Sequence, residues 1–185
     1  MKEINFNEQL LYTVPTSEKN IYNVLNVISN ILNISKPDLV FAPVCRSLDE
    51  PELEGLSVRK DEDPSLKNDL LIININMIKK GPTPDMVILG TLAHEMRHLW
   101  QAKIDFTDPL PSTSVDDPAE VDADAFAALL ISIYFNIDIE DAVKIYNYDL
   151  TIYPYSIEKA FINSICLNAR LNAAKKLKET YNKWI

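Results

Sequence analysis

Apolar and polar residues repeat with two different periods in the first half of the chain. Apolar side chains recur at helical spacing over residues 21–32, which predicts an amphipathic first helix. Short strands are then predicted at residues 39–44, 56–59 and 69–77, and the last of them shows the alternation of period two that is typical of a strand. The third segment is the clearest, because four apolar side chains face one way along it. We therefore expect a small antiparallel sheet after the first helix.

Helical spacing dominates the second half. Thr83, Pro84 and Asp85 form a strong helix start, with a cap, a first-position proline and an acidic first turn, for a helix over residues 84–104. Further helices are predicted at 118–135, 139–148 and 157–181. In the last of these, apolar residues recur every four positions and predict a continuous core-facing stripe. The stripe consists of Ile157, Phe161, Ile165, Ala169, Ala173, Leu177 and Tyr181.

This order of elements predicts an α+β fold in one domain. A first helix and a small sheet occupy residues 1–82, and a helical lobe occupies residues 83–185. The 185 residues are enough to bury a core without disulfide bonds. Cys45 and Cys166 lie far apart in sequence and form no CxxC motif, so we expect buried thiols.

The net charge of −9 argues against several classes of partner. A phosphate backbone or an anionic membrane selects clustered Lys and Arg, and no cluster stands out here except Lys175, Lys176 and Lys178. The first residues lack the apolar stretch of a signal peptide, and no apolar run could span a bilayer. The sequence predicts a soluble, cytoplasmic protein without a nucleic-acid or membrane partner.

The candidate chemistry lies in His94-Glu95-Met96-Arg97-His98. His94 and His98 are the only two histidines, and their spacing places both rings on one helix face. Two imidazoles so placed can bind one Zn²⁺ per chain, while Glu95 lies beside the metal as a general base and acid for a water molecule. This arrangement is the HExxH motif of metallopeptidases, and it predicts a hydrolase that acts on a peptide or protein.

A catalytic zinc needs a third protein ligand, and Glu120 is the best candidate. It follows a loop long enough to reverse the chain and begins the next helix. Asp124 lies one turn further on the same face, where it could accept a hydrogen bond from the outer nitrogen of His94 or His98 and fix its tautomer. An alternative stays open, since Glu120 also occupies the acidic position of a capping box after Asp117. Asp122 faces away from Glu120.

The HExxH motif together with residues 120–130, EVDADAFAALL, resembles the ImmA/IrrE-like zinc metallopeptidases. The resemblance covers residues 69–130 and implies a zincin-like fold of the gluzincin type. It implies His94, His98 and Glu120 as zinc ligands, Glu95 as the catalytic residue and Asp124 in the second shell. Residues 54–58, EGLSV, are similar to a peptide deformylase segment, but the cysteine ligand of that segment is absent.

Two further features could contribute to peptide hydrolysis. Tyr153 and Tyr155 are candidate donors to the oxyanion that peptide hydrolysis creates. The strand at residues 70–76 is a candidate for pairing with an extended peptide. Three alternatives to peptidase activity remain at this point: a catalytically silent peptidase fold that binds a partner, a deformylase-like amide hydrolase, and a helical structural protein whose motif is accidental.

Overall fold

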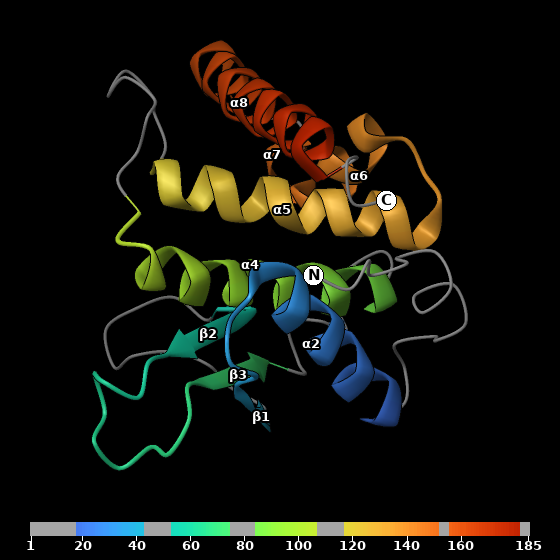
Figure 1. Ribbon diagram of the computed structural model, residues 1–185. Coiled ribbons are helices and arrows are strands. Elements are labelled where there is room, and N and C mark those ends of the chain that lie inside the picture. Colours follow the sequence, from blue (N-terminus) through green and yellow to red (C-terminus); the bar gives the residue numbers. More distant parts are fainter. Residues whose placement is uncertain (1–17, 43–52, 75–83, 107–116, 152–155, 182–185) are drawn as a thin grey trace. The chain divides into compact units, whose positions relative to one another are not determined.

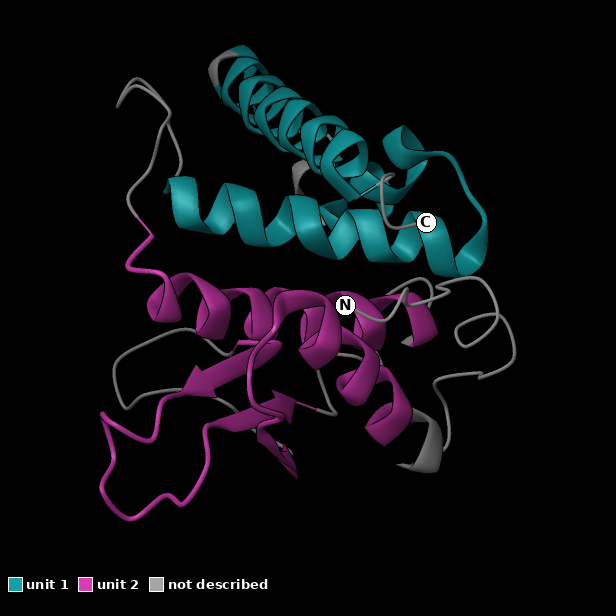
Figure 2. Cartoon of the chain, viewed as in Figure 1, with its two compact units in different colours: residues 1–13, 107–185 teal, residues 14–106 magenta. Residues whose placement is uncertain are grey.

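The computed structural model describes residues 18–42, 53–74, 84–106, 117–151 and 156–181 (Figure 1). The chain divides into two compact units, residues 14–106 in one and residues 1–13 with 107–185 in the other (Figure 2). The boundary follows Phe106, whereas the sequence predicted a change of architecture after residue 82. The helix that carries both histidines therefore belongs to the unit that contains the sheet.

The unit of residues 14–106 is a mixed three-stranded sheet with two helices. Its elements are α2 (Glu18–Leu32), β1 (Asp38–Ala42), β2 (Gly55–Val58), β3 (Leu70–Asn74) and α4 (Pro84–Lys103). The strand order is β1-β3-β2, with β1 parallel and β2 antiparallel to β3. The elements predicted from the sequence are present, but the prediction of an antiparallel sheet is wrong for the β1–β3 pair. Alternation of side chains indicates which face of a strand is buried and carries no information on the direction of its neighbour.

The core of this unit forms where α4 packs on the sheet and on α2. The apolar stripe of α2 is buried as predicted, with Leu25 and Ile28 fully enclosed. Leu71 and Ile73 on β3 are also fully buried, as are Leu92 and Met96 on α4. Contacts of α4 with α2, β2 and β3 hold the helix in this core.

The other unit is helical around a long, apolar helix. Its elements are α5 (Pro118–Phe135), α6 (Ile139–Tyr146), α7 (Tyr148–Thr151) and α8 (Ile157–Tyr181). Side chains of Asp117 and Asp138 cap α5 and α6, and the Ser156 hydroxyl accepts from Lys159 at the start of α8. From Val121 to Ser132 every residue of α5 except Asp122 is buried. Within the described ranges, no helix combines the length and apolar character needed to cross a membrane.

The predicted apolar stripe of α8 is wrong. Ile157, Phe161 and Ile165 are 91%, 67% and 37% exposed. The reason is geometric: four residues turn a helix through about 400°, so each step of four moves the stripe about 40° around the axis. Over the length of α8 such a stripe winds around the helix and cannot stay on one face. The face that is buried instead carries Asn163, Cys166, Arg170 and Ala174.

Candidate metal centre

The two histidines of α4 point their outer nitrogens at one another. The Nε2 atoms of His94 and His98 lie 2.9 Å apart. Their rings are nearly perpendicular, with centroids 4.6 Å apart and an interplanar angle of 80°. Two ligand atoms of a tetrahedral zinc ion, each about 2.0–2.1 Å from the metal, lie about 3.3 Å from one another. The two Nε2 atoms therefore need to move apart by only about 0.4 Å to bind one ion. The predicted pairing of these side chains on one helix face is confirmed.

Gln101 holds the other nitrogen of His98. Its Oε1 atom lies 2.8 Å from His98 Nδ1, and its side chain is buried. A proton on Nδ1 that is donated to this oxygen leaves Nε2 with its lone pair, which is the form that binds a metal. Gln101 was not predicted from the sequence, although it follows His98 by three residues, a spacing at which helix side chains meet.

Glu95 is buried between α4 and the start of β2. Its side chain is only 8% exposed, and its Cγ and Oε1 atoms lie against the backbone of Gly55. A Cβ atom at Gly55 would come within 2.9 Å of Glu95 Cγ and 2.6 Å of Thr91 Cγ2. Gly55 is therefore required by the close approach of β2 to the helix. The hydroxyl of Thr91 in turn lies 3.5 Å from Glu54 Oε2 as a donor.

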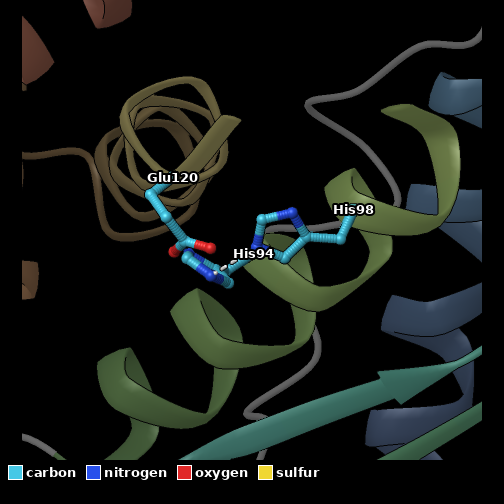
Figure 3. Close-up of side chains that lie close together, drawn as sticks. All are labelled: His94, His98 and Glu120. Carbon is cyan, nitrogen blue, oxygen red and sulfur yellow. Dashed lines mark hydrogen bonds between the residues drawn. The ribbon is translucent and has the colours of Figure 1, made fainter. Parts of the chain in front are cut away.

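Glu120 lies in the first turn of α5 and is exposed. The predicted cap of this helix is confirmed, since Asp117 accepts from Ala119 N at 2.9 Å. In the described part of the chain, His94, His98 and Glu120 form a group in which each side chain offers one ligand atom (Figure 3). These three atoms lie within 4.8 Å of one another, so the group could hold a metal ion. Two imidazole nitrogens and one carboxylate oxygen are a donor set that suits zinc.

Asp124 forms a buried ion pair within the helical unit. Its Oδ2 atom accepts from Arg170 Nε at 2.6 Å, and both side chains are at least 88% shielded from solvent, since they are 12% and 8% exposed. Arg170 Nη1 also donates to the carbonyl of Cys166. Asp124 was predicted to orient a histidine, and this stays a prediction; within the helical unit its carboxylate contacts Arg170 of α8. The sequence pattern gave no signal for Arg170, because the partners are brought together by packing of α5 on α8.

The remaining predicted residues contribute less to the site. Tyr153 and Tyr155 lie outside the described residues, as does Cys45. Cys166 carries a buried thiol, in keeping with its predicted character. Comparisons of the chain with protein-family models, with curated proteins and with solved structures find no match.

Proposed function

We propose that this protein is a zinc-dependent peptidase in which His94, His98 and Glu120 hold the metal. The observation that carries the proposal is the convergence of the two Nε2 atoms, 2.9 Å apart, with Gln101 behind one of them. The donor set of the three residues supports it further. The resemblance of residues 69–130 to ImmA/IrrE-like peptidases points to the same chemistry.

The chemistry of the proposal divides between the ion and Glu95. A bound Zn²⁺ supplies a Lewis acid and lowers the pKa of a water molecule at its open position. Glu95 accepts a proton from the water that attacks the peptide carbonyl carbon, and returns a proton to the amine nitrogen as the C–N bond breaks. Packing of Glu95 against Gly55 fixes the side chain for both transfers. Such positioning matters because misplacement of a catalytic group by about 1 Å can lower a rate about 100-fold.

An extended substrate is proposed to pair with β2 rather than with β3. The predicted pairing along residues 70–76 is wrong over Leu70–Asn74, because β3 is bonded on both sides, and Asn74 is fully buried. Asn74 N donates to Glu54 O at 2.8 Å, so Glu54 turns its main-chain groups toward β3. Because these groups alternate in direction along an antiparallel strand, the N–H and C=O groups of Gly55 and Ser57 point away from β3. Gly55 also contacts Glu95. A peptide paired here would lie beside the general base.

The test of the proposal is Glu95→Gln in the full chain. Zinc content should stay at about one per chain, measured by mass spectrometry of the purified protein, because Glu95 is not a ligand. Hydrolysis of a peptide library should fall by about 10²–10⁴-fold, the usual contribution of a general base. Asp63→Asn, which removes one charge elsewhere in the same unit, serves as the control. Hydrolysis at the wild-type rate by Glu95→Gln would contradict the mechanism, and a wild-type protein that binds zinc but hydrolyses no peptide would favour a binding role.

A second experiment separates the two roles of Glu120. Glutamine retains the acceptor of a capping box but is a much poorer zinc ligand, so Glu120→Gln preserves a cap and removes the ligand. We expect zinc affinity to fall by more than about 100-fold. Loss of a residue that only hydrogen-bonds a metal ligand already lowers the affinity by about 10–100-fold, and loss of a ligand should cost more. Asp122→Asn is the matched control on the same helix. Unchanged zinc affinity in Glu120→Gln would assign Glu120 to the cap alone.

A further inference from the structure

Asn74 is a fully buried polar residue at the end of β3, and two of its donors reach the chain just before β2. Its side-chain Nδ2 donates to the carbonyl of Leu53 at 3.0 Å. Its main-chain N–H donates to the carbonyl of Glu54 at 2.8 Å. One residue thus bonds two consecutive carbonyls of the neighbouring segment. No step of the proposed hydrolysis uses this side chain.

The pairing of β2 with β3 does not by itself require an asparagine at position 74. The two strands pair through main-chain groups, which every residue other than proline provides in full. The bond from Asn74 N to Glu54 is of this kind, whereas the bond to Leu53 needs a side-chain donor. A buried amide is costly unless it is hydrogen-bonded, so an apolar side chain would fill this position at lower cost. The bond to Leu53 is therefore the contribution that is specific to asparagine.

The segment that Asn74 anchors leads directly to Gly55, which lies very close to α4. A Cβ atom at Gly55 would be 2.9 Å from Glu95 Cγ and 3.0 Å from Glu95 Oε1. Because the spacing is so tight, movement of Gly55 toward or away from α4 displaces or releases the Glu95 side chain. A further contact of this segment with α4, from Thr91 Oγ1 to Glu54 Oε2, is 3.5 Å long and therefore weaker.

We propose that Asn74 is a positioning residue for the general base of the proposed peptidase. Its amide holds the start of β2 in place, and Gly55 in turn holds Glu95 in the orientation needed for proton transfer. Displacement of a catalytic group by about 1 Å can lower a rate about 100-fold, so a partial displacement is enough for a measurable effect. The proposal rests on the proposed function, in which Glu95 is the general base.

Asn74→Leu in the full, zinc-loaded chain tests this role. Leucine is similar in shape and keeps the main-chain N–H, but it removes the donor to Leu53. We expect kcat per bound zinc to fall about tenfold, as for a shift of a fraction of an ångström. KM should change little, because β2 remains paired with β3 and still presents its outer edge to the substrate. Zinc affinity should be unchanged, since both histidine ligands lie on α4.

Asn147→Leu is the matched control. Asn147 is also buried, and its Nδ2 donates to the main-chain carbonyl of Val143 at the same distance of 3.0 Å, but in the helical unit. Both substitutions should lower the free energy of unfolding, whereas only Asn74→Leu should lower kcat per bound zinc. If Asn74→Leu does not fold, Asn74→Ser removes the same donor with a small polar side chain, and the same fall in kcat is expected. An unchanged kcat in the folded variant would overturn the proposal and assign Asn74 to stability alone.

A double substitution tests the route through Gly55. Gly55→Ala should lower kcat about tenfold in the otherwise wild-type chain, because the new Cβ displaces Glu95. In the Asn74→Leu chain the start of β2 has already lost its anchor, so the same change should cost much less. Independent sites have additive effects, so an equal loss in both chains would show that Asn74 does not act through Gly55 and would overturn the proposal.

The contact between Gly55 and Glu95 can also be followed without turnover. The nuclear Overhauser effect between Gly55 Hα and Glu95 Hγ reports the distance between the two residues. The effect should weaken in Asn74→Leu and persist in Asn147→Leu, and persistence in both would overturn the proposal. A wild-type chain that hydrolyses no peptide, while Asn74→Leu weakens this signal, would contradict the peptidase function and retain the positioning of Glu95 by Asn74.

Discussion

The long helices α4 and α8 both bury polar side chains, but those side chains have different kinds of partner. On α4, Gln101 contacts a candidate metal ligand and Glu95 lies against the backbone of Gly55. On α8, Arg170 forms a buried ion pair with the carboxylate of Asp124. A buried polar group whose charge is fully matched contributes to specific packing, whereas groups that converge on an open ligand position are available for chemistry. Substitutions should therefore affect stability in α8 and metal binding or turnover in α4.

The largest effect is expected at the ion pair of α8. Arg170→Ala leaves the Asp124 carboxylate buried without its cation, and removal of one partner of a buried pair costs about 3–5 kcal/mol. The free energy of unfolding, measured by denaturant titration with a chelator present, should fall by that amount. The chelator removes any contribution of bound metal.

A double substitution is the control for this effect. Asp124→Leu with Arg170→Met replaces the pair by apolar side chains and should recover most of the lost stability, because no buried charge remains. A loss below about 1 kcal/mol in Arg170→Ala, typical of exposed pairs, would show that water reaches Asp124 and would weaken the contrast between the helices.

The next effect belongs to α4 and concerns metal affinity. Gln101→Ala removes the acceptor at His98 Nδ1, so His98 loses both its orientation and its preferred tautomer. Zinc affinity should fall by about 10–100-fold, measured by competition with a chelating dye. Gln101→Glu restores an acceptor at the same distance along the side chain and should regain most of that affinity. If both variants bind zinc as the wild type does, Gln101 has only a packing role.

A smaller effect is expected from Gly55, which concerns turnover alone. In Gly55→Ala the new Cβ meets Thr91 and Glu95, so the Glu95 side chain has to shift. We expect kcat to fall about tenfold, which is a fraction of the loss that follows misplacement by a full ångström, with zinc affinity unchanged. Addition of Thr91→Ser removes the methyl group of the shortest contact, 2.6 Å, and should restore part of the rate. Equal rates in all three proteins would show that the strand moves freely to make room.

The sequence predicted those features that depend on short-range spacing. One helical turn relates His94 to His98, and the side chain of Asp117 caps its own helix, so both follow from local geometry. The parallel β1–β3 pair and the Asp124–Arg170 contact join residues far apart in sequence, and period alone does not specify such partners. The same limit explains the error in α8. Residues four apart share a face over one turn, but over about six turns a stripe with this spacing moves around the helix axis to other faces.

The smallest effect tests that explanation of α8. Phe161 is apolar but 67% exposed, so Phe161→Ser should change the free energy of unfolding by less than about 0.5 kcal/mol. The same measurement on Leu92→Ala, at a fully buried position of α4, should show a loss of about 2–5 kcal/mol. Had the stripe faced the core, the two substitutions would be of similar cost. A loss above about 2 kcal/mol in Phe161→Ser would mean that the ring is covered, and would restore the original prediction for the first turns of α8.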